Sequence, residues 1–271
     1  MSTAGALGDS FLELRGIHKG FGGERVLRGL DLSVCPGEIF TILGGSGSGK
    51  SVSLKHIIGL LHPDRGRVFV EGRDVTALSE TNWVDVRKCF GYVFQGAALF
   101  DSLSVFENVA YALREHLDWP EERISARVAE CLDAVGLAGI EGSMPAQLSG
   151  GMRKRVGVAR AIALEPKAIL YDEPSSGLDP ANARRIGELI QALRRKLAVT
   201  SVVVTHDLDL CFAISDRVGL LMNGHLVAEG SVDEIRNSPL PFVRDFLAGG
   251  DGSETRPADK LRGAEERDDG P

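Results

Sequence analysis

The sequence predicts an α/β fold with a mainly parallel sheet, a β-rich N-terminal part and a helical insertion. Residues 168–171 and 201–204 are short apolar runs rich in branched side chains, and each follows a segment with helical spacing. Such runs are typical of buried parallel strands. From residue 81 to about 142 the pattern becomes helical and more polar. We expect the helical insertion to span about residues 88–165.

Local patterns predict the individual elements. Residues 26–34 partly alternate between apolar and polar side chains, as a half-buried strand does, and residues 67–70 give another strand. Apolar residues recur at three- and four-residue spacing in residues 104–116 and 121–135, which predicts two helices. Asn223-Gly224, between two apolar segments, is a strong hairpin signal.

Length and composition describe one large domain followed by a charged tail. The 271 residues are 43% hydrophobic and 25% charged, which is enough to bury a core, and we place the domain at residues 11–248. Residues 249–271 contain few apolar side chains, so we expect a flexible tail there. The net charge of −7 argues against a nucleic-acid partner.

Cysteine usage and hydropathy exclude further classes of protein. Cys35, Cys89, Cys131 and Cys211 form no C-x-x-C pair, so neither a zinc site nor a disulfide framework is expected. No apolar run approaches the roughly 18 residues of a membrane span. Residues 1–8 lack the charged start and the long apolar run of a secretory signal. A role at a membrane would therefore require another chain.

Residues 44–51 match the phosphate-binding motif G-x-x-x-x-G-K-S over its full length. The motif lies between a strand-like run, 39–43, and a helix-like run, 52–61, which is the context that it requires. We expect Lys50 to reach the β- and γ-phosphates of a nucleotide and the Ser51 hydroxyl to bind Mg²⁺. An ordinary glycine-rich turn is the alternative, and the length and setting of the motif argue against it. The candidate phosphate-binding residues are Gly44, Gly45, Ser46, Gly47, Ser48, Gly49, Lys50 and Ser51.

An acidic pair, Asp172 and Glu173, closes the apolar run 168–171. A carboxylate at this end of a strand, facing a phosphate loop, can hold Mg²⁺ directly or through water. Glu173 is then placed to accept a proton from an attacking water. A solvated acidic pair is the alternative, and it would be favoured if no phosphate loop preceded it.

A second glycine-rich segment, residues 148–152, precedes the helical run 153–164. Ser149 could cap that helix, and Gly150 and Gly151 could expose backbone N–H groups as a second anion site. With this segment the chain resembles the ATP-binding cassette (ABC) ATPase family over about residues 11–248. The motifs that carry the resemblance occur in the family's order: the phosphate loop, residues 148–152 as signature loop, 171–174 as acidic strand end, 176–179 as D-loop and 205–207 as switch.

The resemblance implies a head-to-tail dimer that hydrolyses ATP. Each nucleotide would lie between the phosphate loop of one subunit and the signature loop of the other. The residues that this implies are Ser149, Gly150 and Gly151 at the γ-phosphate in trans, Asp179 in the D-loop, His206 at the γ-phosphate, Gln95 at Mg²⁺ and Phe21 stacked on adenine. For Phe21, packing in the core is the alternative. Met152 departs from the family, which has Gln at this position.

Residues 95–116 and 148–155 look more specifically like the ATPase subunits of Mla-type transporters. This resemblance implies a membrane permease and an MCE-domain protein as partners, phospholipid movement between the two membranes of a diderm bacterium, and a peripheral position on the cytoplasmic face of the inner membrane. We expect some of Phe100, Leu103 and Phe106 to line the groove that receives a short helix of the permease, with packing of all three in the helical core as the alternative. A transporter ATPase for another small solute remains an alternative, and a soluble ABC ATPase without a permease is a weaker one. The sequence leaves open whether a small regulatory subunit binds.

Overall fold

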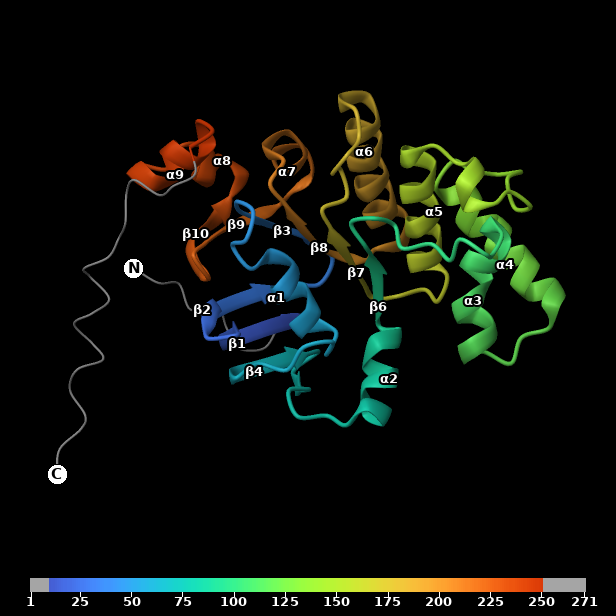
Figure 1. The fold of residues 1–271 in the computed structure, drawn as a ribbon, viewed down its shortest axis with the longest axis horizontal. Helices are drawn as coiled ribbons and strands as arrows, with labels where there is room; N and C mark the ends of the chain where they lie inside the picture. The colour runs from blue at the N-terminus through green and yellow to red at the C-terminus, as the bar shows by residue number, and fades with distance from the viewer. Residues whose placement is uncertain (1–9, 251–271) are drawn as a thin grey trace.

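Two β-sheets occupy the centre of the molecule (Figure 1). The computed structural model describes residues 10–250, so the tail expected at 249–271 lies outside the described residues from 251 on. One sheet has four strands in the order β2-β1-β4-β5, and the other has six in the order β10-β9-β3-β8-β7-β6. Antiparallel pairing joins β1 to β2 and β4, and β9 to β10, whereas β3 runs parallel to β8 and β9, and β7 runs parallel to β6 and β8. The predicted α/β class with a β-rich N-terminal part is therefore confirmed.

The strands have the following bounds. The antiparallel sheet contains β1 (Leu12–Phe21), β2 (Glu24–Val34), β4 (Arg65–Val70) and β5 (Arg73–Asp74). The larger sheet contains β3 (Ile39–Leu43), β6 (Phe90–Val93), β7 (Ala168–Asp172), β8 (Thr200–Thr205), β9 (Arg217–Met222) and β10 (His225–Ser231).

The three central strands of the larger sheet explain the apolar runs in the sequence. Every residue of β3, β7 and β8 is buried, because helices and the second sheet cover both faces. Parallel strands end at the same edge of a sheet. The residues that follow β3, β7 and β8 are therefore brought together, although they are far apart in the sequence.

The predicted hairpin joins β9 to β10, which pair in antiparallel fashion. Asn223 and Gly224 have φ angles of 49° and 80°, the left-handed values that a two-residue hairpin turn requires. A Cβ atom on Gly224 would overlap the carbonyl oxygen of Val26. Gly224 O also accepts a hydrogen bond from the Arg28 N–H at 2.9 Å, so this turn fastens the two sheets together.

The helices fall into groups on either side of the sheets (Figure 1). Their bounds are α1 (Lys50–Ile57), α2 (Glu80–Lys88), α3 (Val105–His116), α4 (Glu121–Ala134), α5 (Gly150–Ile162), α6 (Pro180–Leu197), α7 (Leu208–Ile214), α8 (Val232–Arg236) and α9 (Pro241–Leu247). Helices α3, α4 and α5 pack together at one end of the molecule, and α8 and α9 lie at the other. The two helices predicted at 104–116 and 121–135 are confirmed as α3 and α4. Within the range 88–165, β6 belongs to the six-stranded sheet, and the boundaries of a helical subdomain stay a prediction.

Candidate nucleotide site

The phosphate loop connects the end of β3 to the start of α1. A Cβ atom on Gly44 would overlap the Leu221 carbonyl oxygen, and one on Gly49 would lie 2.7 Å from Leu27 Cδ2. These two glycines therefore let the loop pack closely against β9 and β2. Cβ atoms on Gly45 and Gly47 would meet nothing within 4 Å, so these glycines lie open to the cleft.

A cleft of about 850 Å³ opens over this loop. Residues 45–52 form its floor, and its walls include Gln95, Glu173 and His206. Within the described part of the chain, the Ser48 hydroxyl is buried and has no hydrogen-bond partner. A helix start, backbone left bare by glycine and an unused hydroxyl donor together fit the phosphates of a nucleotide.

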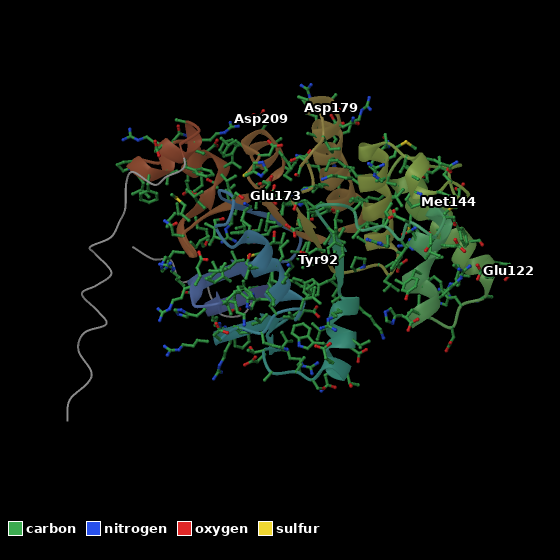
Figure 2. All side chains as sticks on the ribbon, in the orientation of Figure 1. Tyr92, Glu122, Met144, Glu173, Asp179 and Asp209 are labelled. Atoms are coloured by element: carbon green, nitrogen blue, oxygen red, sulfur yellow. The ribbon has the colours of Figure 1, made fainter. Side chains whose placement is uncertain are left out.

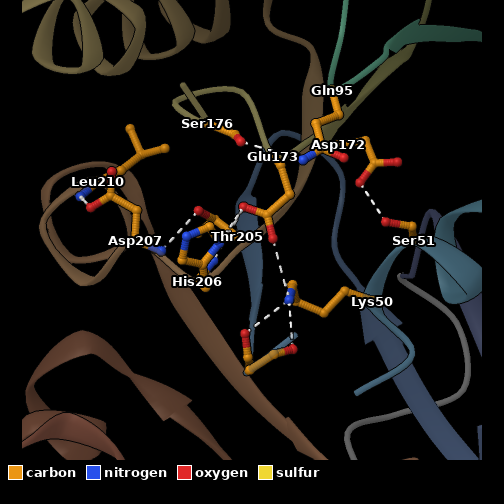
Figure 3. Close-up of polar contacts among 12 residues, drawn as sticks. Lys50, Ser51, Gln95, Asp172, Glu173, Ser176, Thr205, His206, Asp207 and Leu210 are labelled. Carbon is orange, nitrogen blue, oxygen red and sulfur yellow. Dashed lines mark hydrogen bonds and ion pairs between the residues drawn. The ribbon is translucent and has the colours of Figure 1, made fainter. Parts of the chain in front are cut away.

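Lys50 lies across the loop with only 7% of its surface exposed. Its Nζ donates to the carbonyl oxygens of Gly44 and Gly45, both at 2.9 Å, and lies 3.2 Å from Glu173 Oε1 (Figure 3). A buried ammonium group needs such partners, because burial without them is costly. The Lys50 charge is thereby held at the mouth of the loop, where phosphate would bind.

Glu173 lies between Lys50 and His206 (Figure 3). Its Oε2 is 2.9 Å from His206 Nδ1, and the Glu173 side chain is 9% exposed. The backbone N–H of Glu173 donates to Val204 O at 2.9 Å, which ties the end of β7 to β8. Glu173 has a φ angle of 47°, which is uncommon for a residue with a side chain. Such conformations often occur at functional sites and persist only where the surroundings hold them.

Ser51 and Asp172, predicted as metal ligands, are in contact. The Ser51 hydroxyl donates to Asp172 Oδ1 at 2.7 Å, and the Tyr92 hydroxyl donates to Asp172 Oδ2 at 3.1 Å. Burial, together with the neighbouring carboxylate, raises the pKa of Tyr92 well above its usual value, so this hydroxyl stays a donor. Gln95, the third predicted ligand, lines the same cleft but donates through Nε2 to the Ser176 hydroxyl at 3.3 Å.

The signature loop and the D-loop lie outside the cleft of their own chain. Ser149 caps α5 and accepts from Met152 N at 3.2 Å, and both Ser149 and Gly150 are exposed. Asp179 caps α6 by accepting from two backbone N–H groups, and the bond from Asn182 N lowers the pKa of Asp179 most. Figure 2 shows Asp179 at the outer end of α6, away from Glu173. A Cβ atom on Gly151 would lie 3.2 Å from Asn182 Oδ1, so these two helix starts are neighbours.

Phe21, expected to stack on adenine, is the last residue of β1 and is 47% exposed. The alternative that it packs in the core is therefore wrong. Its ring lies 5.6 Å from Lys19 Nζ and is not part of the cleft wall. Its role toward a nucleotide stays a prediction.

Sequence reasoning missed several residues that border the site. Tyr92 contacts Asp172 because β6 pairs with β7, and this pairing is not visible in the sequence. Leu208 and Phe246 form part of the cleft wall, and Phe246 comes from α9 near the end of the described residues. The contact between Tyr92 and Asp172 could have been predicted only if the order of the strands in the sheet had been known.

Comparison with known proteins gives the following likenesses. Residues 27–176 match the family described as ABC transporter. The chain is 41% identical over 238 residues to the probable ribonucleotide transport ATP-binding protein mkl of Mycobacterium leprae, covering 88% of this chain and 69% of that protein. It is 40% identical over 240 residues to the intermembrane phospholipid transport system ATP-binding protein MlaF of Escherichia coli K12, covering 89% of each. It is 43% identical over 231 residues to the methionine import ATP-binding protein MetN of Leifsonia xyli, covering 84% of this chain and 68% of that protein.

Solved structures give the same likeness at the level of the fold. The structure of cbiO1 from Clostridium perfringens, part of the cbiONQ ABC transporter complex, has a TM-score of 0.78 and 28% identity, and covers 88% of this chain and 95% of that one. A dimeric ATP-binding cassette in a post-hydrolysis state, bound to ADP and Pi, has a TM-score of 0.76 and 31% identity. That likeness covers 82% of this chain and 98% of the cassette.

Proposed function

The chain belongs to the ABC transporter family of ATP-binding proteins, and on this premise we propose that it hydrolyses ATP as a head-to-tail dimer to drive a separate permease that moves phospholipids. ATP binding and hydrolysis follow from the family. The observation that supports the assignment of the site is the meeting of three strand ends. There Lys50, Glu173 and His206 form one continuous set of contacts beside the Ser51–Asp172 pair.

Lys50 and the loop N–H groups bind the β- and γ-phosphates in this proposal. The Lys50–Glu173 contact is given up when phosphate takes its place at Nζ, and the Glu173 carboxylate then accepts a proton from the attacking water. His206 contacts the γ-phosphate from the end of β8. The contact between His206 Nδ1 and Glu173 Oε2 at 2.9 Å supports a shared role for the two side chains at the γ-phosphate.

Mg²⁺ would be held by Ser51 and Asp172, with Gln95 as a third oxygen donor beside them. The ion would neutralise charge on the phosphates during transfer. Magnesium usually takes few protein ligands and completes its shell with phosphate oxygens and water. The short contact between Ser51 and Asp172 supports the proposal, because the two oxygens already face each other.

A second copy of the chain would complete each site. Ser149, Gly150 and Gly151 are turned away from their own cleft, and two of them are exposed. Asp179 lies nearby at the start of α6. A head-to-tail partner would bring this set of residues over the nucleotide of the first copy.

The permease would contact the segment that follows Gln95. Phe100 and Tyr111 are 45% and 50% exposed, and their rings lie 5.1 Å apart. Leu103 is half-buried, and Phe106 packs against the core of the helical part with the Arg114 guanidinium 5.5 Å from its ring centre. The permease surface that we propose is therefore the Phe100–Tyr111 pair rather than Phe106.

Attachment through the permease would place the chain on the cytoplasmic face of the inner membrane. Among residues 10–250, every helix falls short of the length and apolarity that crossing a bilayer requires. We propose the ATPase domain at residues 11–248, with its helical part at about 88–165.

Phospholipid is the proposed cargo because the likeness to MlaF covers 89% of both chains. An MCE-domain protein would be the further partner. The functions that the names of mkl and MetN give, ribonucleotide transport and methionine import, keep another small solute as the second candidate. Purification of the assembled complex from membranes decides between them: bound phospholipid together with a permease and an MCE-domain chain supports the proposal, and a complex without lipid that binds methionine or a ribonucleotide overturns it.

The chemistry is tested by Glu173→Gln in the full-length chain. Glutamine keeps the shape of the side chain but cannot accept the proton, so ATP binding should persist while hydrolysis falls by about 100-fold or more. Hydrolysis at the wild-type rate would remove Glu173 from the role of base.

The permease surface is tested by Phe100→Asp. Since Phe100 is 45% exposed, the variant should fold and bind nucleotide, yet lose co-purification with the permease. Leu240→Asp is the matched control, because Leu240 is a 39% exposed apolar residue at the start of α9. A Phe100→Asp chain that co-purifies as well as Leu240→Asp would exclude this surface.

A further inference from the structure

Lys154 is a buried cation on α5 that no step proposed so far uses. It lies five residues after Ser149, is 7% exposed, and donates through Nζ to the backbone carbonyl oxygen of Glu173 at 3.1 Å. Within residues 10–250, the Glu173 carbonyl oxygen is the acceptor to which the Lys154 ammonium group donates. Burial lowers the pKa of Lys154, and the charge of Glu173 opposes that effect.

The carbonyl that Lys154 contacts belongs to a residue in an unfavourable backbone conformation. The φ angle of Glu173 is 47°, a left-handed conformation that is unfavourable for a residue other than glycine. Its carbonyl oxygen also accepts from Ser176 N at 3.1 Å, and its N–H donates to Val204 O. Lys154 is therefore the one side chain among residues 10–250 with a hydrogen bond to the backbone of Glu173. The direction of the Glu173 carboxylate depends on this backbone.

Stability alone does not account for a lysine at this position. The buried Lys154 ammonium group loses its hydration, and in return it gains one hydrogen bond to a neutral acceptor and a charge interaction with the Glu173 carboxylate. The Glu173 carboxylate has Lys50 Nζ at 3.2 Å and His206 Nδ1 at 2.9 Å, so it would not be left unpaired without Lys154. The Glu173 carbonyl would keep its bond from Ser176 N, so no polar group of the backbone would be left unpaired. Because these groups keep other partners without Lys154, we look for the role of this buried charge in the geometry of Glu173.

We propose that Lys154 is a positioning residue, which holds the backbone of Glu173 in its left-handed conformation and so aims the Glu173 carboxylate at the attacking water. This inference rests on the proposed role of Glu173. It also gives α5 two tasks, because the helix starts at the signature loop, which serves the neighbouring subunit, and contacts Glu173 of its own chain one turn later. Lys154 acts in cis, whereas Ser149 acts in trans.

Lys154→Met in the full-length chain is the first test, because methionine is an unbranched side chain only one heavy atom shorter than lysine and has neither its charge nor its donors. We expect kcat for ATP hydrolysis to fall by roughly 10- to 100-fold, since small misplacements of a catalytic group have effects of this size. The KM for ATP, nucleotide binding and the melting temperature should stay at their wild-type values.

Arg155→Met is the matched control on the same helix. Arg155 also donates to backbone carbonyls, those of Val135 and Gly136 at 3.2 Å, but it lies away from Glu173. This variant should keep its kcat. A kcat of Lys154→Met equal to that of Arg155→Met overturns the proposal, and so does a loss of kcat that comes with weaker nucleotide binding and a lower melting temperature.

The cis assignment is tested with mixed dimers purified through two different tags. The reference dimer pairs a Glu173→Gln chain with a wild-type chain, which leaves one intact catalytic glutamate. Placing Lys154→Met in the chain that keeps Glu173 should reduce single-turnover hydrolysis well below the reference. Placing it in the Glu173→Gln chain should leave the reference rate unchanged. The reverse pattern would show that Lys154 acts through its signature loop, and the proposal would be wrong.

These outcomes separate this inference from the proposed function. If Glu173→Gln itself hydrolyses ATP normally, the role of Glu173 fails and the inference fails with it. If Glu173→Gln abolishes hydrolysis while Lys154→Met leaves kcat intact, the role of Glu173 stands and only the role of Lys154 is lost.

Discussion

Asn108 determines the shape of the segment that presents Phe100, and its replacement by alanine gives a quantitative prediction. The Asn108 side chain lies on α3 and is fully buried. Its Oδ1 accepts from Phe100 N at 2.8 Å, and its Nδ2 lies 3.0–3.1 Å from the carbonyl oxygens of Phe100, Leu103 and Ser104. One amide thus closes the whole turn between residues 100 and 104.

The expected cost of Asn108→Ala follows from these contacts. The substitution removes an amide whose two N–H donors and one oxygen acceptor are all in use, and each net hydrogen bond contributes about 1 kcal/mol. The higher helix propensity of alanine offsets about 0.6 kcal/mol of this loss in the free energy of unfolding. We therefore expect the free energy of unfolding to fall by roughly 2–3 kcal/mol, and the melting temperature by about 5–10 °C.

Urea and thermal unfolding of the purified chain measure this change, and pull-down from membranes measures its effect on the permease contact. Because Phe100 would lose its fixed orientation, co-purification should weaken even where the variant is folded. Glu115→Ala, an exposed change on the same helix, is the control and should stay within about 0.5 kcal/mol of wild type. Asn108→Ala with a stability equal to that control would show that water replaces the amide, and the reasoning would be refuted.

Two further predictions concern packing and thiol chemistry. Gly59→Ala should destabilise the chain by roughly 2–5 kcal/mol, measured by urea unfolding, because Gly59 has a φ of 64° and a Cβ atom would overlap the Trp83 ring; unchanged stability would contradict the packing between α1 and α2. Burial raises the pKa of Cys131 to about 11 and that of Cys211 to about 12, so the thiolate fraction of both is very small at pH 8. Mass spectrometry after brief alkylation of the folded chain should therefore find label on the exposed Cys35 and little on these two, with equal labelling as the contrary result.

The parts of the site that could be predicted from the sequence are those that a short, continuous segment of sequence specifies. The phosphate loop has a fixed motif length, and the acidic pair follows a fully buried strand, so both could be placed on strand ends before the strand order was known. The contact between Ser51 and Asp172 then follows from the way parallel strands end at one edge. The turn at Asn223-Gly224 was predictable for a similar reason, because its backbone conformation is specified by two residues.

The parts that sequence could not predict depend on which elements become neighbours. Gln95 was expected at the metal, yet its amide contacts Ser176, and only the relative position of β6 and the D-loop decides this. Nothing in the spacing of α5 indicates that Lys154 reaches the carbonyl of Glu173. For Phe106, the pattern of α3 allowed both a core and a surface position, and packing against the helical core resolves it.

The same helix α5 also holds the segment that leads to the proposed permease surface. The Arg160 guanidinium donates to the carbonyl oxygens of Ala97 and Ala98, both at 2.7 Å, and these alanines have φ angles of 63° and 46°. Two successive left-handed residues need such support, since neither is glycine. Starting at Ser149, α5 thus contacts Glu173 through Lys154 and residues 97–98 through Arg160. In the proposed dimer, a displacement of α5 would therefore act both on the backbone of Glu173 and on the segment that leads to the proposed permease surface.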